Sequence, residues 1–191
     1  MTFGPRRHVS LVALSVVAFA CVELSALAGE LRSGPQPGER LAATFEPLNV
    51  TGEHAGDLHC LVCEYGLSPV VMMFAREPSE ALVQLLVKLD AATGKHRSQE
   101  LGAFVVFLND KPELQGELVA LAKKQGLKHL VLAIDAPAGP DGFKVAAEAD
   151  VTVVLYREHA VKANHAFRRG ELDGKAAEKI LADLPKILVE K

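Results

Sequence analysis

The chain has 191 residues, of which 49% are hydrophobic and 24% charged, and its formal net charge is −3. A mildly acidic chain without a basic tract is poorly suited to phosphate backbones, so we expect no nucleic-acid partner. The length is sufficient for one domain with a hydrophobic core, even after a leader is removed.

Residues 1–28 have the build of a secretory signal peptide. Arg6-Arg7 forms a short basic start, an apolar run extends from Val9 to Val22, and Ala26-Leu27-Ala28 is a small-residue cleavage site. The run is shorter than the roughly 20 residues of a spanning helix, so we expect cleavage rather than anchoring. The mature chain is then exported, to the periplasm or the extracellular space, with no transmembrane span.

Within the leader, Cys21 leaves open an alternative in which this residue is lipidated and anchors the chain to a membrane. The segments that follow the leader carry less periodic signal. Residues 29–43 are rich in Gly and Pro and predict an extended lead-in. Short apolar stretches at 45–50 and 57–62 predict a small hairpin or a pair of short edge strands at the start of the main domain, residues 44–191.

The rest of the chain alternates between buried strands and amphipathic helices. Apolar runs predict strands near 69–75, 101–108, 128–134, 151–157 and 161–168. Apolar stripes predict helices near 79–92, 113–125 and 173–184, and a short helix over 143–148. Alternation of this kind gives parallel strands with covering helices, and the last two strands are close enough in sequence to pair antiparallel.

Two of these strands carry a family resemblance. Val71-Met72-Met73-Phe74-Ala75-Arg76-Glu77 is similar to the strand before the active site of the redoxin-type thioredoxin-like proteins, a group of exported thiol-disulfide oxidoreductases and peroxiredoxin relatives. Asp150-Val151-Thr152-Val153-Val154-Leu155-Tyr156 is similar to the strand after their cis-proline. The resemblance implies an α/β three-layer sandwich, with a mixed central sheet, helices on both faces and the redoxin-type insertion.

The same resemblance implies a site that this chain does not possess. It places the two catalytic cysteines of the family near Pro78 and Ala81, and neither residue is a thiol. Val151 stands where the family has its cis-proline. The usual oxidoreductase and peroxidase sites are therefore both missing.

Cys60 and Cys63 are the thiols that remain, on the other side of the first core strand from the site of the family. We expect the chain to turn between them, because residues i and i+3 of a strand lie too far apart for a disulfide. Gly66 and Pro69 argue against a helix behind the pair. The pair is a candidate catalytic dithiol that exchanges disulfides with another exported protein, and if the chain is an enzyme, it is a thiol-disulfide oxidoreductase.

Two alternatives remain open at this point. The bond can be structural, within a non-catalytic thioredoxin-like module that serves binding or structure. His54 and His59 can also join Cys60 and Cys63 in holding a zinc or copper ion, since imidazoles and thiolates suit both metals, although a single Cys-x-x-Cys pair is a weak metal signal. In the first two interpretations no cofactor is needed.

Overall fold

The computed structural model describes residues 1, 2, 4 and 31–188. The expected signal peptide lies outside these residues apart from its first few positions, and so does Cys21. Within the described part of the chain, no helix is both long enough and apolar enough to cross a membrane.

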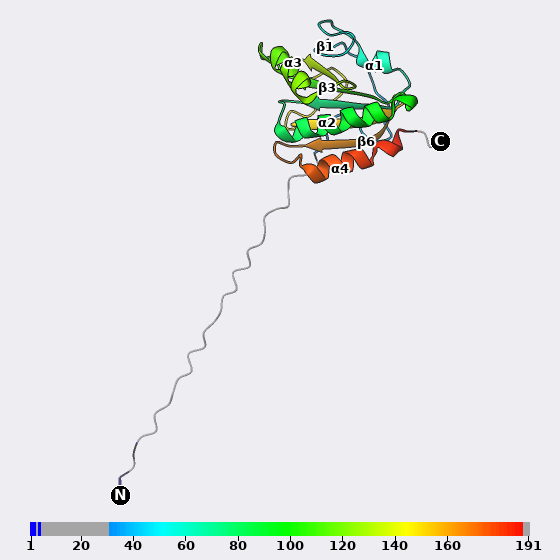
Figure 1. Cartoon of the computed structure of the whole chain (residues 1–191). Helices are drawn as coiled ribbons and strands as arrows, with labels where there is room; N and C mark the ends of the chain where they lie inside the picture. The colour runs from blue at the N-terminus through cyan, green and yellow to red at the C-terminus, as the bar shows by residue number, and fades with distance from the viewer. Residues whose placement is uncertain (3, 5–30, 189–191) are drawn as a thin grey trace.

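A six-stranded mixed sheet forms the centre of the fold (Figure 1). The strand order across the sheet is β1-β4-β3-β2-β5-β6. The strands are β1 (Leu48–Asn49), β2 (Val70–Ala75), β3 (Gly102–Leu108), β4 (Val131–Asp135), β5 (Val151–Arg157) and β6 (Ala160–Phe167). β2, β3 and β4 run parallel, β5 and β6 add an antiparallel hairpin beside β2, and β1 pairs antiparallel with β4.

The helices follow from local sequence signals. α2 (Glu80–Lys95) begins after Ser79, whose hydroxyl accepts a hydrogen bond from the Leu82 amide. α3 (Leu114–Gln125) ends at Gly126 in the left-handed conformation that glycine adopts without strain. α4 (Gly174–Ala182) begins after Asp173, and the remaining α-helix in the described part of the chain is the short α1 (Leu61–Tyr65). α2 and α4 lie side by side (Figure 1).

Two cores lie on opposite faces of the sheet, because alternate residues of a strand point to opposite sides. Val71, Met73 and Ala75 of β2 pack on the face that α2, α3 and α4 cover. Val70, Met72 and Phe74 pack on the other face, beneath α1 and irregular segments that include Phe45 and Phe143. Every residue of β2 is buried, as the continuous apolar run predicts.

The parallel pairing of β2 with β3 confirms the predicted crossover through α2. The helix expected over 143–148 is wrong. Its backbone is used for other contacts: Lys144 has a positive φ of 54° and its carbonyl accepts from Gly34, while the Ala146 amide donates to Ser33 Oγ. A segment whose polar groups are committed to the lead-in and to Arg76 cannot also form helical hydrogen bonds.

Candidate functional site

The Cys60–Cys63 pair is closed as a disulfide at the start of α1. The Cα atoms of the two cysteines lie 5.2 Å apart, as the expected turn between them requires. The strand expected over 57–62 is wrong: only an isolated antiparallel bridge joins Leu58 to Leu48, and α1 begins at Leu61. The pair stands before β2, at the opposite end of that strand from Pro78.

The prediction that no helix follows the pair is wrong. Cys60 is the N-cap of α1, and its Sγ accepts a hydrogen bond of 3.1 Å from the Cys63 amide. Gly66 then ends the helix with a positive φ of 52°, so the helix fits within a single turn before β2. The sulfur takes the part that a Ser or Asp oxygen plays at other helix starts.

The two sulfur-bearing residues differ in accessibility. Cys60 is only 8% exposed and packs with Leu61 and Val62 in the core beneath α1, whereas Cys63 is exposed. A thiolate arriving from solvent therefore meets the Cys63 side of the bond. Reduction would leave Cys60 beside the Cys63 amide, whose N–H stabilises a negative sulfur.

The floor of this site is aromatic. The Tyr65 ring stacks on Phe104 of β3 with centroids 6.0 Å apart. A Cβ at Gly102 would lie 2.5 Å from the Tyr65 ring, so α1 can rest on β3 only because residue 102 is glycine. Burial, with a smaller contribution from Glu64, raises the pKa of Tyr65 to about 12. Tyr156 is fully buried, and its hydroxyl has no hydrogen-bond partner among the described residues.

Two histidines and a carboxylate gather beside the disulfide. The rings of His54 and His59 stack with centroids 3.6 Å apart. His59 Nε2 lies 2.9 Å from Glu64 Oε2, and one ligand atom from each of the three residues lies within 4.8 Å of the others. Of the four predicted metal ligands, the structure brings His54 and His59 together, while Cys60 and Cys63 are bonded to each other.

Glu64 is the member of this cluster that the sequence did not predict as a ligand. In an extended strand, residues 59 and 64 would lie roughly 16 Å apart. The turn of α1 brings Glu64 back toward His59 instead. The signal that can reveal it is the cysteine before Leu61, once that cysteine is recognised as a helix cap.

The end of the sheet where the redoxin family has its site carries a different set of residues. A pocket of about 500 Å³ there is lined by residues that include Pro78, Ser79, Ala81, Asn109 and Arg169. The Ser79 side chain is already used as the N-cap of α2. Val151, at the start of β5, follows a trans peptide bond, since the described residues contain no cis bond.

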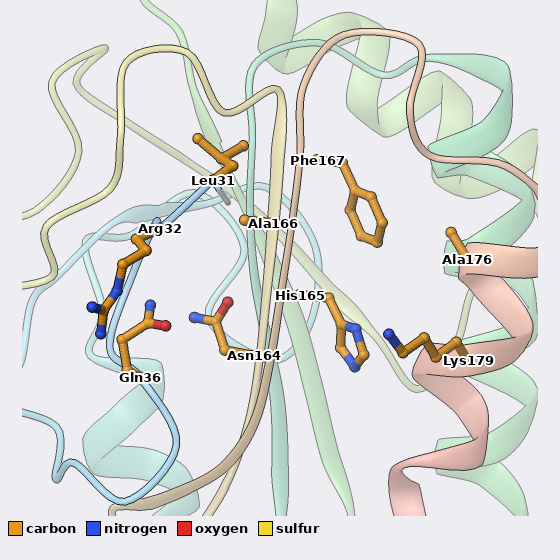
Figure 2. Close-up of a pocket in the computed structure, with 9 residues that line it drawn as sticks. All are labelled: Leu31, Arg32, Gln36, Asn164, His165, Ala166, Phe167, Ala176 and Lys179. Carbon is orange, nitrogen blue, oxygen red and sulfur yellow. The ribbon is translucent and has the colours of Figure 1, made fainter. Parts of the chain in front are cut away.

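A further pocket of about 490 Å³ lies along the edge strand β6 (Figure 2). His165 and Phe167 point toward α4 and Lys179, while Asn164 points to the other side of the strand, toward the lead-in. His165 Nε2 lies 3.0 Å from Asp183 Oδ2, and Asn164 donates to two carbonyls of the lead-in. The polar groups are thus divided between two sides of β6 and are used in fold contacts.

Comparison with known proteins gives no match to a family model and none to a curated protein. Solved structures do match. A Bacteroides thetaiotaomicron protein provisionally assigned as a protein disulfide isomerase has a TM-score of 0.60 and 18% identity, over 84% of this chain and 96% of its own. A Chlorobium tepidum protein provisionally assigned as the thiol:disulfide interchange protein DsbE has a TM-score of 0.51 and 17% identity, over 81% and 99%. A peroxiredoxin-like protein from Aquifex aeolicus has a TM-score of 0.55 and 11% identity, over 82% and 91%.

These likenesses and the sheet topology define the fold as thioredoxin-like, as the sequence predicted. At sequence identities this low, the structural similarity establishes only the fold. The activity has to be argued from the site.

Proposed function

We propose that this chain is an exported thiol-disulfide exchange protein that acts through Cys60 and Cys63. The observation that carries the proposal is the asymmetry of the pair. Cys63 is exposed to attack, and Cys60 is buried against a backbone N–H that stabilises it as the leaving group. Exchange chemistry needs one accessible sulfur and one sulfur that departs easily.

The exchange runs in two balanced steps. A partner thiolate attacks Cys63 Sγ, a mixed disulfide forms, and the electron pair of the broken S–S bond moves to Cys60 Sγ. A second thiolate of the partner then attacks the partner's sulfur in the mixed disulfide, and Cys63 leaves as a thiolate. The partner has gained a disulfide, and Cys60 and Cys63 have taken up two electrons and two protons. The reverse sequence reduces a partner disulfide.

The position of the bond argues against the structural alternative. Both cysteines lie in one turn of α1, so the disulfide joins no distant parts of the fold. In the chain-entropy model, closing a four-residue ring stabilises a protein by about 2 kcal/mol, the low end of the usual range. A bond that contributes little to folding can be opened and closed in a working cycle.

Two exposed leucines support a protein partner. Leu58 is 69% exposed and Leu67 is 64% exposed, and they flank the pair in sequence. Exposed apolar side chains on both sides of the cysteine pair in the sequence suit the binding of an extended or partly folded polypeptide.

Redox titration tests the proposal. The chain carrying Cys21→Ser, so that Cys60 and Cys63 are its only thiols, is equilibrated in glutathione buffers and read by thiol alkylation. We expect a midpoint above about −230 mV, in the range of exchange proteins, and a midpoint below about −300 mV would favour a structural bond. With a disulfide peptide, Cys60→Ser should accumulate a mixed disulfide at Cys63.

Export has its own test. Intact-mass measurement on protein recovered from its native cells should show a chain that begins at Gly29, after Ala26-Leu27-Ala28. A chain that begins at a lipid-modified Cys21 would place the protein on a membrane surface instead.

A further inference from the structure

We propose that His54, His59 and Glu64 form a zinc site, which Cys63 completes when the disulfide is reduced. The three side chains already present their ligand atoms within 4.8 Å of one another, with His59 and Glu64 in contact at 2.9 Å. This proposal does not depend on exchange with a protein partner. It requires only that a chemical reductant can open the bond.

The distances suit a tetrahedral metal after a small adjustment. Zinc binds imidazole nitrogen at about 2.0–2.1 Å and carboxylate oxygen at about 2.0–2.2 Å, so neighbouring ligand atoms in a zinc site lie roughly 3.3 Å apart. The side chains of His59 and Glu64 are 29% and 34% exposed, and His54 is half-buried, so they can rotate without disturbing the core. The stacked rings of His54 and His59 already hold two imidazoles at one place.

The chemistry of the ligands selects the metal. Two imidazoles and one carboxylate form a mixed nitrogen and oxygen set that occurs at zinc sites with an open fourth position. Cuprous ion prefers soft thiolates and thioethers, and the carboxylate of Glu64 counts against it. The loop that carries His54 also contains the exposed acidic residues Glu53 and Asp57, which favour a cation over an anion.

Cys63 is the cysteine that we assign as the fourth ligand. It is exposed and is followed directly by Glu64, whereas Cys60 is buried in the core beneath α1. Reduction by a water-soluble phosphine transfers two electrons to the disulfide, water supplies the oxygen of the phosphine oxide, and the two sulfurs become thiols. Binding of Zn²⁺ then displaces one proton from Cys63. The reduced chain therefore offers four ligands where the oxidised chain offers three.

Zinc binding and the redox state of the Cys60/Cys63 pair are consequently linked. A ligand that binds the dithiol more tightly than the disulfide stabilises the reduced form. For this two-electron couple, each tenfold preference of Zn²⁺ for the reduced chain shifts the midpoint by about 30 mV toward more positive potential.

The experiment uses the full chain with Cys21→Ser and Zn²⁺ alone as the probe. Zinc affinity is measured by competition with a chromophoric chelator, with the chain oxidised and then reduced by the phosphine. We expect one Zn²⁺ per chain and an affinity at least tenfold higher after reduction. His59→Gln should lower the affinity at least tenfold in both states, and His54→Gln, in the exposed loop, should do the same.

Two further variants isolate the thiol and the cluster. Under reductant, Cys63→Ser should bind Zn²⁺ only as tightly as the oxidised parent chain. His96→Gln is the matched control, because His96 lies at the end of α2, a helix that packs on the other face of the sheet, and its affinity should equal that of the parent. Equal zinc affinity in the parent, His54→Gln and His59→Gln would overturn the site. A parent affinity that reduction leaves unchanged would overturn the role of Cys63. Neither result would alter the glutathione midpoint measured without zinc.

Discussion

The two ends of strand β2 carry different kinds of residues. The amino pole, residues 54–67, holds a disulfide with one exposed sulfur, two histidines and a glutamate. The carboxyl pole, residues 76–81, begins α2 and holds no cysteine. The seven residues from Pro69 to Ala75 separate the poles by roughly 20 Å. In the redoxin family that the strand sequences resemble, the dithiol belongs at the carboxyl pole.

Under the proposed exchange function, the thioredoxin-like sheet does not by itself determine where its chemistry lies. What a redox pair needs locally is a turn that brings two sulfurs together and an N–H donor for one of them. At the carboxyl pole the start of α2 offers such a turn, but Ser79 occupies the cap. At the amino pole α1 offers the same arrangement in five residues, with Cys60 as the cap.

The largest expected effect comes from exchanging thiols for hydroxyls at the two poles. Cys63→Ser should lower the rate of exchange with oxidised glutathione at least about 100-fold, because the accessible sulfur is gone. Ser79→Ala removes only a helix cap and should leave that rate unchanged, while it costs about 1 kcal/mol of stability. A large loss of exchange in Ser79→Ala would show that the carboxyl pole is the active one.

Arg76 tests whether the carboxyl pole is structural. Its guanidinium donates to the carbonyls of Pro137, Ala146 and Ala149, and thereby fixes the loop between β4 and β5. Arg76→Met leaves these carbonyls without their donor, and we expect a loss of about 2–4 kcal/mol in the free energy of unfolding, measured in urea. The exchange rate of the folded variant should not change.

Arg169→Gln is the control for the removal of charge at this pole. Arg169 is 77% exposed and lies 3.6 Å from Glu77, an arrangement that contributes little to stability. If Arg169→Gln lowered the free energy of unfolding as much as Arg76→Met, then positive charge at this pole, and not the contacts of Arg76 with the loop, would account for the stability.

Much of the fold could be predicted from the sequence, because buried strands and amphipathic helices have distinct apolar periods. The strand from Val70 to Ala75 and the crossover through α2 follow from such patterns. The helix expected over 143–148 is absent, because contacts with Ser33 and Arg76, distant in sequence, take its polar groups. Local sequence carries no signal for these contacts.

The two cysteines of the candidate site could be predicted from the sequence, but the local structure around them could not. Cys60 and Cys63 stand out as a pair, and the need for a turn follows from the reach of a disulfide. The helix behind them was missed, because cysteine is not among the residues that commonly cap helices. Without that helix, Glu64 could not be placed beside His59.

Tyrosine ionisation measures how tightly the amino pole is packed. The chain has two tyrosines and no tryptophan, so tyrosinate absorbance reports Tyr65 and Tyr156 alone. Burial raises the pKa of both, to about 12 for Tyr65. Since the fold favours the neutral phenols, their contribution to stability is complete below pH 10 and is lost as the pH rises from about 10 through 12.

We therefore expect no tyrosinate transition near pH 10 while the far-ultraviolet circular dichroism stays native. Ionisation should accompany unfolding at higher pH. An absorbance step at pH 10 in the folded protein would mean that α1 does not hold Tyr65 against Phe104 of β3, and the separation of a buried Cys60 from an exposed Cys63 would then fail as well.

The smallest expected effect concerns the apolar side chains that flank the disulfide. Leu58 and Leu67 can bury part of their surface against a polypeptide but have nothing to contact on glutathione. The double variant Leu58→Ser with Leu67→Ser should slow exchange with a disulfide peptide that carries apolar flanks by about threefold to tenfold, which corresponds to about 1 kcal/mol of lost contact. Exchange with oxidised glutathione should keep its rate. Val119→Ser, at a 50% exposed position on α3, removes a similar apolar group far from the pair and should affect neither reaction. If the double variant slowed both reactions equally, the leucines would be supporting α1 itself, and the amino pole would present a reactive sulfur without a surface for binding a polypeptide.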